Sequence, residues 1–177
     1  WLTLLDAVQA EPQIPPGASV GRLRMTSSLQ WLSWRPITDV LRVDAQSHTE
    51  FSHGPLQATP DLKRYLQLPT GSNPRTQALG EQLLAELRSP PHTDINTHDL
   101  LRLKTGGYTY TLEPGVVNST HTADDFWFDS KQGFCEHIAS AFAVLMRGMG
   151  VPARIVTGYQ GGDRNGVDNY WTVRNSD

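Results

Sequence analysis

The sequence predicts an α+β fold in which helices follow a small β unit. Short runs of leucine, valine, threonine and tryptophan, separated by proline, glycine and serine, recur through residues 1–58. Helical periodicity then dominates, and a strongly periodic helix followed by a predicted hairpin ends the chain. At 177 residues the chain is long enough for one sizeable core and a smaller neighbour.

The β unit, residues 1–58, is expected to be antiparallel. Its predicted strands are Trp1–Leu5, Gly21–Met25, Leu29–Trp34 and Asp39–Val43. Trp31 and Trp34 are compatible with a carbohydrate or peptide platform, but tryptophans more often pack against a core, and we predict packing for both.

Connecting helices are predicted over residues 59–92. Thr59-Pro60 and Asn73-Pro74 each place a capping residue before proline, which is typical of a helix start. The second of these helices has one apolar face, made of Leu79, Leu83 and Leu87. A third helix is expected from Thr97 to Thr105, and a strand follows it at Tyr108–Leu112.

Cys135 is the only cysteine, and the pattern after it predicts a helix. The apolar stripe consists of Ile138, Phe142, Leu145 and Met149, and the stop signals are Gly150 and Pro152. We therefore expect Cys135 in the first turn, on the buried face. Unpaired backbone N–H groups at that end favour a thiolate and can bind an oxyanion. A lone cysteine can also be a small buried apolar residue with no chemical role. The residues around Cys135 therefore decide between a nucleophile and a packing residue.

The residues around Cys135 form a motif in several parts. It runs Gly133-Phe-Cys-Glu-His137, then Ala139-Ser-Ala-Phe142, then Leu145-Met-Arg-Gly-Met-Gly-Val-Pro-Ala-Arg-Ile-Val-Thr-Gly-Tyr159-Gln-Gly-Gly162, with Asp125-Phe-Trp-Phe-Asp129 before it and Tyr170-Trp-Thr-Val-Arg174 after it. This motif resembles that of the transglutaminase-like superfamily, in particular its bacterial, membrane-anchored TgpA-type branch. The resemblance is strong over residues 93–177 and weaker over residues 1–92.

The resemblance implies that residues 93–177 are the N-terminal part of a papain-like core, in which the nucleophile helix packs on an antiparallel sheet. It makes Cys135 the nucleophile. Arg154–Tyr159 and Tyr170–Arg174 are predicted to form a hairpin beside the helix. Trp127 is predicted to pack beneath the helix, and donation of its indole N–H to an oxyanion stays open as an alternative.

A cysteine nucleophile needs a histidine base that a carboxylate or amide orients. His137 lies two residues after Cys135, so on a helix the two side chains point apart. The other histidines precede the cysteine. In the family the chain order is Cys, His, Asp, which implies that the histidine and aspartate lie beyond Asp177. We therefore expect a catalytically inert fragment of a longer enzyme.

The resemblance implies acyl transfer like that of a protein-glutamine gamma-glutamyltransferase, through a thioester at Cys135. The partners would be a glutamine donor in a protein or peptide and a primary-amine acceptor. Two alternatives stay open: a cysteine peptidase or amidase, and a non-catalytic papain-like binding module. No metal or cofactor site is predicted, and a net charge of −3 without a Lys/Arg run argues against nucleic acid. The branch also implies a periplasmic domain of an inner-membrane protein.

Overall fold

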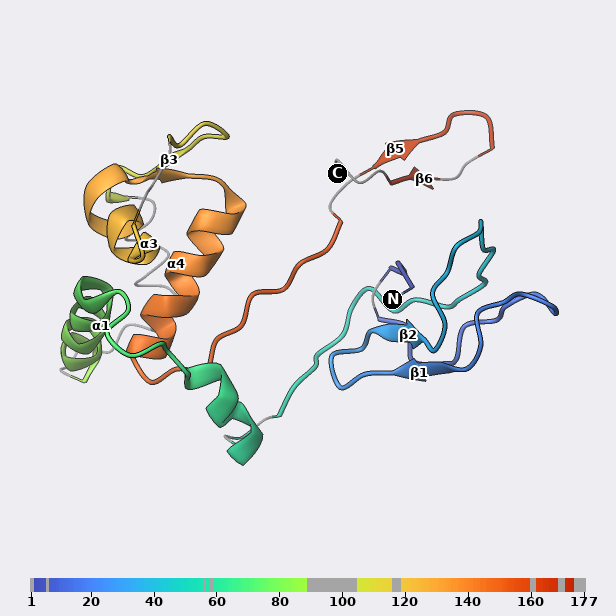
Figure 1. Cartoon of the computed structure of the whole chain (residues 1–177), viewed down its shortest axis with the longest axis horizontal. Coiled ribbons are helices and arrows are strands. Elements are labelled where there is room, and N and C mark those ends of the chain that lie inside the picture. The colour runs from blue at the N-terminus through green and yellow to red at the C-terminus, as the bar shows by residue number, and fades with distance from the viewer. Residues whose placement is uncertain are drawn as a thin grey trace. The chain divides into compact units, whose positions relative to one another are not determined.

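The protein has a mixed α+β fold made of two compact units, Trp1–Leu56 and Gln57–Asp177. The structure, a computed structural model, describes residues 2–5, 7–55, 57, 59–88, 105–115, 119–159, 162–168 and 171–173. Within these ranges all the helices belong to the second unit (Figure 1). In the same ranges, no helix has the length and apolar character required to cross a membrane.

The first unit is built on one antiparallel pair of strands. β1 (Leu23–Met25) pairs with β2 (Trp31–Ser33). Trp31 is buried, and its indole N–H donates to the Val8 carbonyl at 2.8 Å, so it packs as predicted. Trp34 is 77% exposed, and the prediction that it also packs is wrong. Successive strand residues alternate between faces, so a residue three positions after Trp31 points away from the core.

Two of the four predicted strands in this unit are absent from the described residues. Residues 2–5 and 39–43 join no ladder. Leu2 instead donates its N–H to the Trp31 carbonyl at 2.8 Å, and the second segment leads to a single bridge between Gln13 and Asp44. Leu2 is a buried member of the small core, and Leu41 and Val43 pack against it. Their apolar character therefore reflects burial and not strand pairing.

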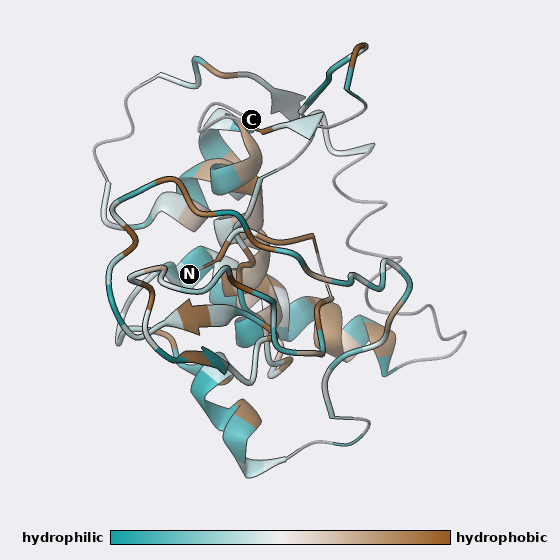
Figure 2. Cartoon of the chain, turned by 90° about the vertical axis from the view of Figure 1, so that its right-hand side faces the viewer, coloured by the Kyte–Doolittle hydropathy of each residue, from teal (hydrophilic) through white to brown (hydrophobic). Residues whose placement is uncertain are grey.

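The second unit is a group of helices around one long amphipathic helix, α4 (Cys135–Gly148). The others are η1 (Pro60–Leu66, a 3-10 helix), α1 (Pro74–Leu87), α3 (Thr122–Asp124) and η2 (Asp125–Ser130, a π-helix). The core of this unit consists of Leu79, Leu83, Ala123, Phe126, Trp127, Ala141, Leu145, Met146 and Met149. Both predicted helix starts, at residues 60 and 74, are confirmed. η1 is mostly hydrophilic in Figure 2 and has no buried residue.

The helix predicted over residues 97–105 lies outside the described residues except for Thr105. The predicted stop of α4 is confirmed, since the helix ends at Gly148 and Gly150 has a φ of +78°.

α1 and α4 approach closely because both have a glycine at their contact. Figure 1 shows α1 beside the C-terminal half of α4. A Cβ on Gly80 would lie 3.1 Å from the backbone carbon of Gly148, and a Cβ on Gly148 would lie 3.3 Å from the Cα of Gln77. Any larger side chain at either position would push the two helices apart.

The N-termini of α1 and α3 cap each other. Buried Asp124 accepts the backbone N–H groups of Arg75 at 3.1 Å and Thr76 at 2.7 Å, and the Thr76 hydroxyl at 2.6 Å. In return, Oδ1 of Asn73 accepts the N–H groups of Ala123 at 2.9 Å and Asp124 at 3.3 Å. Asn73 is the N-cap residue of α1, as predicted, but its side chain makes no capping hydrogen bond to its own helix. Asn73 has the left-handed φ of 47° and not the extended backbone of an ordinary N-cap residue.

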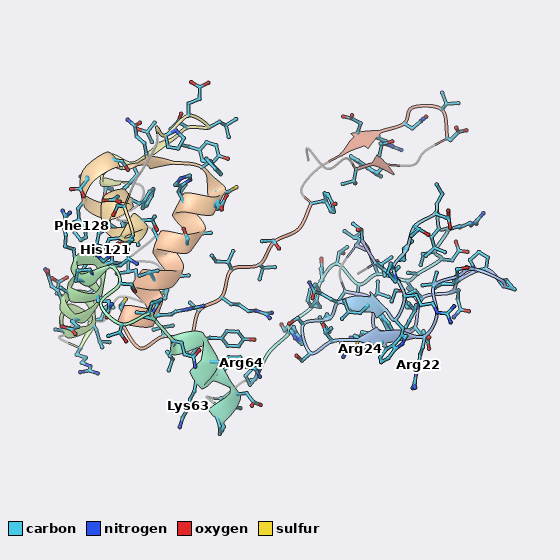
Figure 3. All side chains as sticks on the ribbon, in the orientation of Figure 1. Arg22, Arg24, Lys63, Arg64, His121 and Phe128 are labelled. Atoms are coloured by element: carbon cyan, nitrogen blue, oxygen red, sulfur yellow. The ribbon has the colours of Figure 1, made fainter. Side chains whose placement is uncertain are left out.

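Further side chains secure the start of α1, where Figure 3 shows the labelled His121 and Phe128. Nδ1 of His121 accepts the N–H of Asn73 at 3.0 Å. The guanidinium of Arg75 lies 4.4 Å from the centre of the Phe128 ring and 2.8 Å from a carboxylate oxygen of Asp129. The hydrogen bond with Asp129 raises the pKa of Arg75. The acidic neighbours thus offset the unfavourable placement of a cation at a helix N-terminus.

The strands of the second unit are short. β3 (Thr109–Tyr110) lies parallel to β4 (Gln132–Gly133), and β5 (Asp163–Arg164) lies antiparallel to β6 (Trp171–Thr172). Residues 109–110 confirm part of the strand predicted at 108–112. The strand predicted at 154–159 is wrong, because these residues join no ladder, and the first strand of the hairpin is β5 instead.

Replacing Asp124 with alanine is expected to lower the free energy of unfolding by roughly 2–4 kcal/mol, because it removes the cap of α1 and leaves the buried Thr76 hydroxyl unpaired. Urea denaturation followed by circular dichroism measures the loss. Asp129→Ala is the matched control, since it removes only an exposed ion pair and should change stability little. Equal losses in the two variants would contradict the reciprocal cap.

Candidate active site

Cys135 is the first residue of α4, as predicted, but it is exposed. The prediction that it lies on the buried face is wrong. The fully buried positions of α4 begin at Ala141, and Ile138 and Phe142 are only half-buried against the core. The helix therefore extends beyond its core by more than one turn at the N-terminal end, and this leaves the thiol open to solvent.

The start of α4, where Cys135 lies, has no side-chain cap for its backbone donors. The N-cap residue is Phe134, whose side chain has no acceptor atom. The first helical bond runs from the N–H of Ile138 to the Phe134 carbonyl at 3.1 Å. The N–H groups of Cys135, Glu136 and His137 consequently have no carbonyl four residues earlier within the helix. Such donors, at the positive end of the helix dipole, suit an oxyanion formed beside the sulfur.

Gly133 fixes the path by which the chain enters α4. It is paired with Tyr110 in the parallel ladder, and its carbonyl accepts the N–H of Thr111 at 3.0 Å. A Cβ at position 133 would lie 2.6 Å from the Cβ of His137, which is closer than such atoms approach in real structures. With His137 in this position, a side chain at 133 would force the start of the helix to shift.

His137 packs against the helix start. Its ring meets the Phe134 ring edge-on, with the ring centres 4.4 Å apart. Its Nδ1 atom is buried and has no hydrogen-bond partner in the part of the chain that the structure describes. Among these residues no hydrogen bond joins a histidine to Cys135; Nδ1 of His121 bonds to Asn73, and His53 bonds to the Ser27 carbonyl. His92 and His98 lie outside the described residues.

Trp127 belongs to the core. It is 1% exposed, and its indole N–H donates to the Ala141 carbonyl at 3.1 Å. Its ring meets Phe126 and Tyr108 edge-on, at 5.3 and 5.4 Å between ring centres. Because the only polar hydrogen of the Trp127 side chain is bonded inside the protein, it is not free for an oxyanion at Cys135.

The second half of the chain matches a known family. Residues 82–176 match the model of the transglutaminase-like superfamily. A protein-glutamine gamma-glutamyltransferase from Pseudomonas aeruginosa is 40% identical over 114 residues, which are 64% of this chain and 17% of that protein. The uncharacterized protein YebA from Bacillus subtilis is 32% identical over 113 residues, which are 60% of this chain and 14% of that protein.

Crystal structures of the periplasmic domain of TgpA from Pseudomonas aeruginosa resemble the fold. The structure bound to ethylmercury has a TM-score of 0.76 and 32% identity, and the match covers 98% of this chain and 58% of that chain. A second structure has a TM-score of 0.76 and 31% identity, with coverage of 92% and 54%. The chain thus spans less than a fifth of the curated relatives and a little over half of the crystallised domain.

Replacing Gly133 with alanine is expected to destabilise the protein by about 1–3 kcal/mol, because the new Cβ would overlap that of His137. Chemical denaturation measures the loss. Gly158→Ala is the matched control, since nothing lies within 4 Å of a Cβ at that position. His137→Gly in the Gly133→Ala background removes the clashing atom and should restore part of the stability. A loss that His137→Gly fails to reduce would rule out the steric explanation.

Proposed function

Because the chain belongs to the transglutaminase-like superfamily, we propose that Cys135 performs acyl transfer from protein-bound glutamine to a primary amine in the complete protein. The sulfur attacks the γ-carboxamide carbon to form a thioester, and the C–N bond breaks as its nitrogen takes up the thiol proton and leaves as ammonia. The amine then attacks the thioester, forms an isopeptide bond and releases the thiol. Water in place of the amine gives deamidation.

The observation that carries this proposal is the position of the only cysteine, exposed at the uncapped start of α4 and inside the family match. A glutamine on a protein is bulky, so its acyl carbon reaches only a sulfur that is open to solvent. The N–H groups of the first turn supply oxyanion stabilisation, which is worth about 3–4 kcal/mol per donor in comparable sites. The 40% identical relative bears the name protein-glutamine gamma-glutamyltransferase, which supports the same donor.

We place the histidine base and its aspartate outside these 177 residues. The family order of Cys, His and Asp supports this placement. The contacts of the described histidines support it too, since His137 packs on Phe134 and His121 accepts from Asn73. The base would move the proton from the thiol to the leaving ammonia, and the carboxylate would hold the imidazole ring in place.

We further propose that this region is the periplasmic part of a bacterial protein anchored in the inner membrane. The match to the periplasmic domain of TgpA, which covers nearly the whole chain, supports this location.

The longer protein is expected to incorporate a fluorescent primary amine into a glutamine-containing peptide, and Cys135→Ala should abolish incorporation because it removes the nucleophile. Mass spectrometry of the peptide measures the product. Ser140→Ala is the matched control on the same helix, since the Ser140 hydroxyl donates to carbonyls of α4 itself. Backbone cleavage of the peptide without amine incorporation would identify a peptidase and contradict the proposal.

The 177-residue chain alone is expected to incorporate no amine, although iodoacetamide should alkylate Cys135 because the thiol is exposed. Mass spectrometry follows both reactions in one sample. Amine incorporation by this chain, lost in Cys135→Ala, would show that the base lies within these residues.

A further inference from the structure

Two large apolar side chains are exposed in and just after β3, the strand that pairs with β4 immediately before Cys135. Tyr110 in β3 is 62% exposed, and Leu112 shortly after it is 75% exposed. Single exposed apolar residues are common on protein surfaces. These two lie two residues apart on the segment that pairs with β4, and β4 ends two residues before the candidate nucleophile, so we looked for a functional explanation.

The ladder defines the side of the β3–β4 pair on which Tyr110 projects. Paired residues of neighbouring strands have side chains on the same face, and Tyr110 is paired with Gly133. A Cβ on Gly133 would point at His137, so the Tyr110 ring lies on the face that borders the first turn of α4. Tyr108, two residues earlier, agrees with this assignment, because it packs against Phe126 in the core.

The direction of β3 brings this segment toward the thiol. β3 and β4 are parallel, and β4 leads through Phe134 directly into Cys135. The Cα of Tyr110 lies one strand spacing from that of Gly133, which precedes Cys135 by two residues. The Cα atoms of Tyr110 and Cys135 are therefore at most about 12–13 Å apart, which a tyrosine and a substrate side chain can bridge together.

We propose that Tyr110, extended by Leu112, forms an apolar ledge that binds the apolar side chain next to the reactive glutamine of the acyl donor. The ledge rests on the proposed function, because it selects substrates for the thioester at Cys135. Contact with the tyrosine ring removes apolar surface from water on both partners. Glu136, one residue after the thiol, is a carboxylate in the exposed first turn. It disfavours acidic residues near the glutamine, so the preferred donor is apolar and not acidic.

Reagents that share one reactive group test the ledge, because Cys135 is the only thiol. N-Benzyliodoacetamide carries an aromatic group that iodoacetamide lacks. The rate with N-benzyliodoacetamide divided by the rate with iodoacetamide is expected to be roughly three- to tenfold higher for this chain than for glutathione. This range corresponds to the free energy of one contact between two aromatic rings. Tyr110→Ser should remove the excess without changing the iodoacetamide rate, while Tyr110→Phe should keep it. Trp34→Ser, which removes another exposed aromatic ring, is the control and should keep the excess.

The same variants in the longer protein extend the test to peptides. Donors with leucine beside the glutamine should be used with a higher kcat/KM than donors with serine there, and Tyr110→Ser should reduce this preference. The proposed ledge would be overturned if the faster alkylation by N-benzyliodoacetamide persisted in Tyr110→Ser. It would also be overturned if that faster alkylation disappeared in the longer protein. If the benzyl preference behaves as expected but the longer protein incorporates no amine, the proposed function fails and the apolar ledge stands as a binding surface.

Discussion

The second unit depends on the buried exchange of hydrogen bonds between Asp124 and the start of α1. A buried carboxylate is unfavourable unless donors replace its water, and Asp124 receives three such donors from Arg75 and Thr76. Asn73 returns two bonds to α3, so each helix start supplies what the other lacks. This exchange fixes the position at which η2 begins.

From that fixed point the chain reaches the nucleophile in eleven residues, the difference between positions 124 and 135. The π-helix η2 buries the consecutive residues Phe126 and Trp127, and the indole of Trp127 bonds to the Ala141 carbonyl of α4. β4 then pairs with β3 and directs Gly133 beneath His137. Cys135 is thus positioned by contacts on both sides of it, although the residue itself is exposed.

The two ends of α4 have different roles: one packs in the core, and the other carries the reactive thiol. Its C-terminal half carries the glycine contact with α1 and buried Leu145, whereas its first turn carries the thiol and backbone donors that have no acceptor within the helix. A helix that ends in solvent keeps the positive end of its dipole for a ligand and not for another protein group. Substitution of Cys135 should therefore affect chemistry much more than folding.

Local patterns in the sequence predicted α1 and α4 well, because apolar spacing and the Pro74 and Gly150 signals act within a few residues. They did not predict the burial or the hydrogen-bond partners of residues whose surroundings come from distant parts of the chain. The stripe of α4 identifies a face but not how far the core extends along it, so Cys135 was assigned to the buried side. Asn73 has a capping residue's identity, but its partner is some fifty positions away. The two-residue strand β4 is too short for any periodicity to reveal.

The exposure of Cys135 also bears on the choice between amine and water as acyl acceptor. A thioester at an open helix end is accessible to both, and exposure alone does not distinguish them. Discrimination must then come from whatever covers the acyl group, because excluding water leaves the bound amine as the nearest nucleophile. A donor whose apolar side chain lies on Tyr110 would cover one flank of the thioester. Under the proposed function, the remaining cover, like the base, would come from other parts of the complete protein, so acyl transfer and the selection of the acceptor would both depend on them.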